Sequence, residues 1–342
     1  MRGLVSKFQV LLGALVVLTV SAFTAPAIAA NGAVVFMYHR FGENDWPTTS
    51  IRLEQFKAHL QEIARGGYTV LPIPEIIDAL QNGRALPDRT IGLSIDDAYR
   101  SVYEKAWPLL QAAKLPFTLF VSTDVIDSGS NNYMSWAQIR ELKDKGVTIG
   151  NQTKSHPHLV ELSLEQVGRE LRASNARLAD EMDEMPTFLA YPFGEYSLQI
   201  KEIASDLGFT AAFGQQSGVM HAAADMFALP RFTMNETYGG IDRFRLAANA
   251  LPLPVTDVLP ADPVLATNPP AFGFTVQPDL AGLAQLACFA SGQGRAKLQR
   301  LDNRVEVRVL EPFPPGRSRI NCTMPGPDRR WRWYGMQFYV PR

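Results

Sequence analysis

The sequence is poor in cysteine and histidine, and it lacks the motifs of several large enzyme classes. Two cysteines and five histidines occur in 342 residues. This excludes cysteine-rich metal motifs, and the chain also has no glycine-rich nucleotide loop and no serine nucleophile elbow. With 33 basic and 34 acidic residues the formal net charge is -1. The chain therefore has no basic field, and we do not expect nucleic acid as a partner.

Long apolar runs are absent beyond the N-terminal segment. That segment begins with Arg2 and Lys7, continues with an apolar stretch over residues 10–23, and reaches a small-x-small cleavage site at residues 27–29. This order is typical of a secretory signal, and the run is short for a membrane span. We predict a signal peptide over residues 1–29, export to the periplasm or the extracellular space, and no stable membrane span after cleavage. The alternative is a single N-terminal anchor.

The rest of the chain is long enough for one large or two smaller domains, and 46% of all residues are hydrophobic. Short β-rich runs alternate with helical patterns between residues 33 and 235. Serine with glutamine three residues later predicts two helix starts, at Ser135 and Ser163. Repeated βα units indicate a parallel sheet, either open or closed into a barrel. The expected strands are 33–37, 68–71, 90–95, 117–121, 147–149, 187–191, 209–213 and 229–232.

The composition changes after about residue 250. Residues 251–270 are proline-rich and are expected to form a linker, and residues 271–342 contain strand-like runs that predict a small β-rich domain. Both cysteines, Cys288 and Cys322, lie in this domain, where export favours a disulfide over two buried thiols. Late aromatic residues of this domain either stack on sugar rings or fill its core or an interface: Trp331, Trp333 and Tyr334.

Two adjacent carboxylates, Asp96 and Asp97, end one expected strand, and His156 follows another. Neighbouring residues of a strand point to opposite sides, so one carboxylate can hold a metal while the other reaches a water. This arrangement suits metal-assisted hydrolysis with a separate carboxylate base. The motifs follow the carboxyl ends of strands, where parallel α/β folds place their chemistry.

Three motifs in this order resemble those of a known family. Residues 94–97, Ser-Ile-Asp-Asp, resemble the T/S-F-D-D motif of NodB-homology polysaccharide deacetylases, carbohydrate esterase family 4. Residues 152–156 resemble the H-[S/T]-x-x-H motif of that family with glutamine in place of the first histidine, and residues 190–194 resemble its third motif without the usual arginine. The resemblance covers roughly residues 33–235. It implies an α/β fold, a distorted (β/α)7-type barrel over residues 30–250, followed here by the small C-terminal β-rich domain.

The resemblance also implies a divalent metal, with Zn²⁺ as the expected ion. Its ligands would be Asp97, His156 and, at the substituted position, Gln152. A carboxamide oxygen is a harder and weaker donor for Zn²⁺ than imidazole. Gln152 therefore either ligates directly, holds a metal-bound water, or accompanies a weak or absent metal, and we predict a site of reduced affinity.

The remaining roles follow from the same resemblance. Asp96 is the expected general base, and Arg231 is the candidate to keep it ionised, unless Arg231 is an ordinary surface residue. His39 is the expected acid for the leaving amine, since exported exopolysaccharide deacetylases begin with a similar Met-Tyr-His. His59 is expected at the surface. His158 is expected at the surface or in contact with the metal ligands, and the alternative is that it compensates for the missing histidine of the motif. The third motif supplies the expected substrate contacts: Tyr191, Pro192, Phe193 and Gly194.

The function implied is removal of N-acetyl groups from an N-acetylglucosamine-containing polysaccharide. Gln152 also leaves open a catalytically impaired, NodB-like glycan-binding module of the cell envelope. A third alternative is a hydrolase of another non-peptide amide or of an O-acetyl ester. The sequence does not predict the natural glycan or the oligomeric state.

Overall fold

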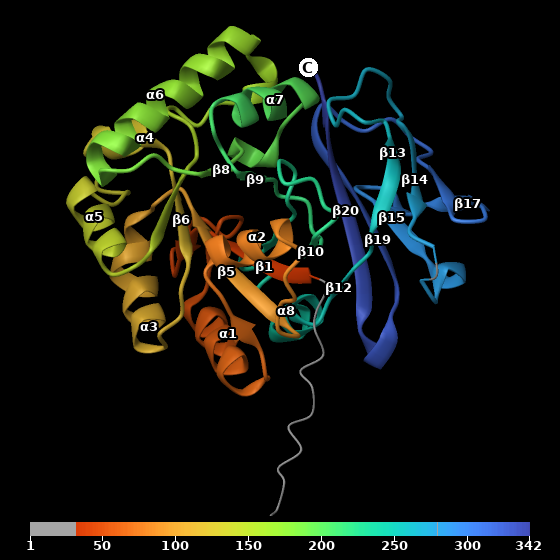
Figure 1. The fold of residues 1–342 in the computed structure, drawn as a ribbon, viewed down its shortest axis with the longest axis horizontal. Helices are drawn as coiled ribbons and strands as arrows, with labels where there is room; N and C mark the ends of the chain where they lie inside the picture. The colour runs from red at the N-terminus through yellow and green to blue at the C-terminus, as the bar shows by residue number, and fades with distance from the viewer. Residues whose placement is uncertain (1–31, 279) are drawn as a thin grey trace, which may run out of the picture.

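The computed structural model describes residues 32–278 and 280–342. The predicted signal peptide, residues 1–29, lies outside the described residues. Figure 1 shows a larger α/β domain beside a smaller β-rich domain made by the later part of the chain. Within the part of the chain that is described, no helix has the length and apolar character needed to cross a membrane.

A curled, nine-stranded sheet forms the centre of the larger domain. Its order is β10-β1-β5-β6-β7-β8-β9, with β4 beside β5 and β11 beside β1, and every pair is parallel except β1 with β10. Every residue of β1 and β5 is buried, as expected for strands that are covered on both faces. The strands are β1 Gly32–Tyr38, β4 Thr69–Val70, β5 Thr90–Asp96, β6 Thr118–Val121, β7 Thr148–Asn151, β8 Phe188–Ala190, β9 Ala211–Phe213, β10 Met220–His221 and β11 Phe232–Thr233.

The segment around β11 links the last and the first parallel strands. Leu229 forms a bridge with Phe213 of β9, and Phe232 pairs with Phe36 of β1. The sheet therefore curls toward closure through a few residues rather than through a full strand. The predicted distorted (β/α)7-type barrel with a β-rich C-terminal region is confirmed.

Helices surround the sheet in Figure 1. Both predicted capping boxes are confirmed: the hydroxyls of Ser135 and Ser163 accept from the backbone N–H of Gln138 and Gln166, at 3.3 Å in each case. These bonds satisfy N–H groups that have no partner inside the helix. The helices are α1 Leu53–Arg65, α2 Ile73–Gln81, α3 Trp107–Ala112, α4 Thr123–Asp127, α5 Trp136–Asp144, α6 Leu164–Met182, α7 Leu198–Asp206 and α8 Ile241–Ala248.

Two sheets build the C-terminal domain, in the orders β12-β20-β19-β15-β16 and β13-β14-β18-β17. Every strand pair in them is antiparallel except β12 with β20, which is parallel. Phe272 and Phe274 from one sheet and Ile320 and Phe338 from the other share one apolar core, which makes the domain a β-sandwich. The strands are β12 Leu251–Pro252, β13 Val255–Leu259, β14 Ala271–Val276, β15 Ala287–Ala290, β16 Gly294–Arg295, β17 Lys297–Leu301, β18 Arg304–Arg308, β19 Gly316–Pro325 and β20 Trp331–Val340.

The proline-rich stretch over residues 251–270 differs from the expected linker. It carries β12, which pairs with β20, and β13, which pairs with β14. Pro252 has no N–H to donate, and β12 is an edge strand, where such a residue is tolerated. The prolines predicted an irregular stretch, but its apolar residues Leu253 and Leu265 pack in the core of the sandwich.

The structure also places the two cysteines and the three late aromatic residues of this domain. Cys288 and Cys322 lie opposite each other on β15 and β19 and form a disulfide inside the core. Trp333 packs edge-on against Phe232 of the barrel, with 5.2 Å between ring centroids. Tyr334 packs likewise on Phe274 at 5.4 Å, whereas Trp331 is 41% exposed. Two of the three aromatic residues considered for sugar stacking, Trp333 and Tyr334, are therefore half-buried and pack on other aromatic rings.

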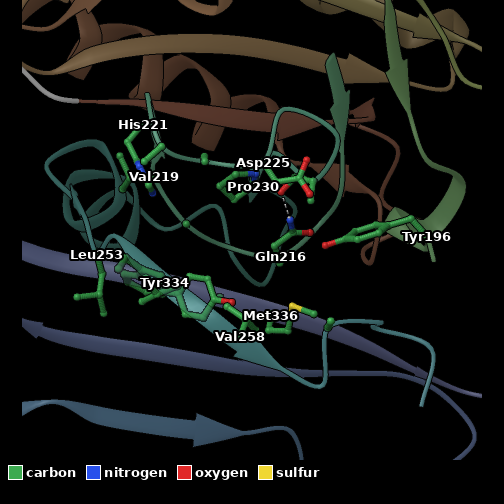
Figure 2. A pocket seen from close by; sticks show the side chains of 18 of the residues that line it. Tyr196, Gln216, Val219, His221, Asp225, Pro230, Leu253, Val258, Tyr334 and Met336 are labelled. Atoms are coloured by element: carbon green, nitrogen blue, oxygen red, sulfur yellow. Dashed lines mark hydrogen bonds between the residues drawn. The ribbon is translucent and has the colours of Figure 1, made fainter. Parts of the chain in front are cut away.

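A cavity of about 260 Å³ separates the two domains on one side. Figure 2 shows Tyr334 and Met336 of β20 below barrel residues that include Gln216, Pro230 and His221. Burial lowers the pKa of His221 to about 4. None of the residues predicted for the active site lines this cavity.

We expect removal of the disulfide to destabilise the protein. The bridge joins cysteines 34 residues apart. In the chain-entropy model a loop of that length stabilises the folded state by about 3 to 4 kcal/mol. Urea unfolding of Cys288→Ala/Cys322→Ala should show this loss, and reductant should lower the midpoint of the wild type but not of the variant. Equal responses of both proteins to reductant would contradict the assignment.

Candidate active site

A buried ion pair between Asp96 and Arg231 lies at the centre of the predicted site. The guanidinium donates to both carboxylate oxygens, at 2.7 Å to Oδ1 and 2.9 Å to Oδ2, and both side chains are fully buried. Its other N–H groups donate to the carbonyl oxygen of Gly214 at 3.0 Å and to the hydroxyl of Ser94 at 3.2 Å. Such bidentate pairs are strong and geometrically specific. The interpretation of Arg231 as a surface residue is wrong.

Asp97 and His156 approach each other next to this pair. Asp97 Oδ1 lies 3.5 Å from His156 Nε2. The same carboxylate oxygen is buried and has no hydrogen-bond partner among the described residues. Both residues have left-handed backbone angles, with φ of 73° at Asp97 and 56° at His156. Non-glycine residues rarely adopt this conformation, and where they do it often serves a functional site.

Hydrogen bonds to α6 hold the loop that carries His156. The Asn151 amide donates to Ser174 Oγ at 2.7 Å and to Asn175 Oδ1 at 2.6 Å. Asn151 Oδ1 accepts from the backbone N–H of Thr153, and Thr153 Oγ1 accepts from the backbone N–H of His156 at 3.0 Å. A buried polar network of this kind fixes the backbone of the loop that presents the imidazole.

Gln152 is fully buried beside both proposed ligands, but its oxygen is already engaged. Oε1 accepts from the backbone N–H of Asp97 at 3.0 Å, and Nε2 lies 3.3 Å from His156 Nε2. Rotating the amide by a half turn would place its NH₂ group against the Asp97 N–H, so that two donors would face each other. The Asp97 N–H therefore requires that Oε1 face it and that Nε2 face His156. In this geometry the amide nitrogen, rather than a ligand oxygen, faces His156. This differs from the expected ligation by Gln152.

The pKa of His156 is lowered, chiefly by burial, although the charges of Asp97 and Asp96 act in the opposite direction. An imidazole that is neutral at ordinary pH has a lone pair to offer a metal. The lowered pKa of His156 favours this neutral form.

These atoms fit two positions of a divalent-metal site. In a tetrahedral Zn²⁺ site with bonds of about 2.0 to 2.1 Å, two ligand atoms are about 3.4 Å apart. The separation between Asp97 Oδ1 and His156 Nε2 matches this value, at 3.5 Å. A group of three or more His, Cys, Asp or Glu residues suited to a metal is not found among residues 32–278 and 280–342.

A cleft of about 540 Å³ opens above these residues. His39 follows β1 and is 8% exposed, with an Nδ1 that is buried and has no hydrogen-bond partner in the described chain. Asp96, Gln152 and Arg231 do not line the cleft, because all three are fully buried. The lining residues important for the chemistry are His39, Asp97, His156, Phe193, Arg317 and Arg319.

Only one residue of the third motif reaches this cleft. The Phe193 ring meets His156 edge-on, with centroids 4.7 Å apart. Tyr191 is fully buried, with its hydroxyl on the carbonyl oxygen of Phe227, and Pro192 and Gly194 are also buried. A Cβ at Gly194, where φ is 71°, would approach the backbone nitrogen of Gln215 to 2.5 Å. The expected substrate contacts at Tyr191, Pro192 and Gly194 are therefore packing positions, and the half-buried Phe193 is the residue of the motif that lines the cleft.

Two histidines outside the ligand set are also held by partners. His59 is fully buried between the hydroxyl of Tyr38 and the carbonyl oxygen of Gly239, so its expected surface position is wrong. His158 stacks on Phe193 at 4.1 Å and bonds to Glu195 at 2.7 Å. Burial raises the pKa of Glu195, and the bond to His158 opposes this shift.

Sequence reasoning missed Glu195, Arg317 and Arg319. Glu195 stands directly after the third motif, so its position next to a known motif was an available signal. The two arginines come from β19 of the other domain, far from every motif in the sequence. Nothing in the local sequence indicated their arrival at the cleft.

We expect Arg231→Met to destabilise the fold strongly, because it leaves the Asp96 carboxylate buried without its partner. Breaking one side of a buried pair costs about 3 to 5 kcal/mol. Asp96→Leu/Arg231→Met should lose less than the sum of the single variants in urea unfolding, since no isolated charge remains. Arg295→Met, at an exposed position, is the control with a change of about 0.5 kcal/mol or less. Additive single effects would contradict the coupling.

Comparison with known proteins agrees with this geometry. A family model described as "Polysaccharide deacetylase" matches residues 83–212. The Bacillus subtilis (strain 168) protein YxkH, whose name assigns it provisionally as a polysaccharide deacetylase, is 24% identical over 207 residues, 60% of this chain and 72% of YxkH. The poly-beta-1,6-N-acetyl-D-glucosamine N-deacetylase of Staphylococcus aureus (strain MSSA476) is 21% identical over 219 residues, 60% of this chain and 75% of the relative.

Solved structures give the same fold. The deacetylase PplD of Streptococcus pyogenes, in complex with acetate, superposes with a TM-score of 0.59 at 22% identity over 64% of this chain and 98% of PplD. IcaB from Ammonifex degensii superposes with a TM-score of 0.57 at 23% identity over 64% of this chain and 98% of IcaB. The resemblance expected from the three motifs is confirmed: residues 83–212 belong to the polysaccharide deacetylase family.

Proposed function

We propose that this protein is an exported polysaccharide N-deacetylase that releases acetate from N-acetylglucosamine units. The observation that carries the proposal is the convergence of Asp97 Oδ1 and His156 Nε2, 3.5 Å apart, in a cleft that also contains His39. The names of the relatives support the reaction class. The disulfide supports an oxidising compartment, either the periplasm or the extracellular space.

Asp97 and His156 would hold the metal, with Zn²⁺ as the expected ion. A divalent ion bound there supplies Lewis-acid polarisation of a carbonyl group and activates water for attack. Gln152 orients Asp97 through the backbone N–H and leaves the remaining coordination positions to water or substrate. A site with two protein ligands is expected to bind its ion weakly.

Two side chains of the protein would accept and donate the protons of the reaction. Asp96 would take a proton from the attacking water. Asp96 does not line the cleft, so this water must reach its carboxylate from beside Asp97, and each carboxylate oxygen keeps a lone pair beyond its bond to Arg231. The water oxygen forms a bond to the acetyl carbon, and the bond from that carbon to the sugar nitrogen breaks. His39 donates a proton to the departing amine. The products are acetate and a glucosamine unit.

Metal binding is the first test of the proposal. Wild-type protein should bind Zn²⁺ in titration calorimetry, release acetate from an N-acetylglucosamine oligomer, and lose this activity reversibly in chelator. Asp97→Asn removes one ligand charge with little change in size, so neither Zn²⁺ binding nor acetate release should survive. Gln152→His adds an imidazole ligand and should bind Zn²⁺ about tenfold more tightly or better.

A second candidate function is favoured by the orientation of Gln152, whose donor nitrogen faces His156. The protein would then be a glycan-binding module of the envelope. A wild type that binds the oligomer but neither binds Zn²⁺ nor releases acetate, with either property gained by Gln152→His, would establish this function instead. A panel of N-acetylated and O-acetylated substrates separates amide from ester hydrolysis.

Asp96→Asn tests the base. A general base contributes about 10² to 10⁴ in rate, so kcat for acetate release should fall at least a hundredfold. Zn²⁺ affinity should change far less, because Asp96 is not a proposed ligand. Undiminished kcat would overturn this assignment and leave the family membership intact.

A further inference from the structure

The C-terminal domain contributes two arginines to the wall of the catalytic cleft. Residues along β19 alternate, so that Ser318 and Ile320 are buried on one face and Arg317 and Arg319 lie on the other. Both arginines line the same cleft as Asp97. A glycan in that cleft would therefore contact both domains.

Contacts across the domain boundary hold these arginines in place. Arg317 Nη1 donates to the carbonyl oxygen of Phe193 at 3.3 Å, and its guanidinium lies 5.4 Å from the Phe193 ring. Arg319 Nε donates to Gln337 Oε1 at 2.9 Å. Gln337 in turn donates to the carbonyl oxygens of Phe193 and Gly194 at 3.1 and 2.9 Å. The two guanidinium groups are thus positioned on the same turn that presents Phe193 to the cleft.

The charge of this pair is poorly compensated. Within the described chain no carboxylate lies at ion-pair distance from Arg319. Glu195, the partner of Arg317, is 3.6 Å away from it and makes a shorter bond of 2.7 Å to His158. Burial and the neighbouring charge of Arg317 lower the pKa of Arg319, although a guanidinium remains protonated in proteins.

Asp97 is the one acidic side chain among the residues that line the cleft in the described structure, and the proposed metal would take up its charge. An anion between Arg317 and Arg319 would relieve their mutual repulsion. The planar arginine fork matches the geometry of carboxylate and other oxyanions. The overall charge of -1 shows that this is a local feature rather than a general attraction to polyanions.

We propose that Arg317 and Arg319 bind an oxyanion substituent of the glycan close to the sugar that is deacetylated, so that the substrate is an acidic polysaccharide. This inference rests on the proposed function. It assigns the C-terminal domain to substrate selection, and the arginines are specificity residues rather than catalytic ones.

The test uses the full mature chain and three oligosaccharides of equal length. One contains only N-acetylglucosamine, one alternates N-acetylglucosamine with a uronic acid, and one carries sulfate in place of the carboxylate. Dissociation constants are measured by calorimetry with the metal chelated, and kcat/KM by acetate release with Zn²⁺. The variants are Arg319→Gln, Arg317→Gln and Arg319→Lys, with Arg295→Gln of β16 as the control outside the cleft. Urea midpoints establish that each variant is folded.

The wild type should prefer an acidic oligomer over the neutral one. Arg319→Gln and Arg317→Gln should each lower the acidic-to-neutral ratio of kcat/KM about tenfold, mainly through KM, and Arg319→Lys should lose less than Arg319→Gln. Arg295→Gln should keep the wild-type ratio. The carboxylated and sulfated oligomers identify which oxyanion is preferred.

The outcomes separate the two proposals. Acetate release without any preference, or equal losses on acidic and neutral oligomers in the arginine variants, would overturn the oxyanion site and leave the deacetylase. Arginine-dependent binding of the acidic oligomer without acetate release would overturn the deacetylase and leave the site.

Discussion

The structure depends on one requirement: the Asp96 carboxylate is buried inside the barrel and must be matched by a buried cation. Arg231 meets this requirement from the segment that joins the last parallel strand to the first. Because the guanidinium also binds Gly214 and Ser94, a displacement of that segment would leave several buried polar groups without partners. Closure of the sheet and placement of the proposed base, Asp96, therefore depend on the same segment of the chain.

Much of the barrel was predictable because its signals are local. Buried parallel strands appear as continuous apolar runs, capping boxes mark helix starts, and the acidic pair ends a strand. Arg231 was a candidate because the third motif lacks the arginine that the resemblance leads one to expect, and its burial could not be read from the sequence. His59 was misplaced, because a histidine on a helix can be buried when two distant groups, Tyr38 and Gly239, satisfy both ring nitrogens.

The errors at the site have a common physical cause. A motif specifies residue types, whereas the direction of each side chain depends on partners elsewhere in the chain. Tyr191 turns inward because the carbonyl oxygen of Phe227 accepts its hydroxyl, and the Gln152 oxygen faces the Asp97 N–H, which also donates to the carbonyl oxygen of Phe120. The arginines of β19 reach the cleft only because the β-sandwich packs against the barrel. The fold neighbours PplD and IcaB are matched almost completely while about a third of this chain remains unmatched.

The late position of β19 and β20 in the chain has a consequence for how the cleft forms. Strands β19 and β20 follow the whole barrel in the chain, yet Gln337 of β20 holds the turn at Phe193 and Gly194. During synthesis the chain emerges in sequence order, so the residues of the barrel are made before the strands that complete its cleft. A barrel that folded at that stage would have a groove without the wall that β19 supplies. Competence to select substrate would arrive last, when the sandwich docks.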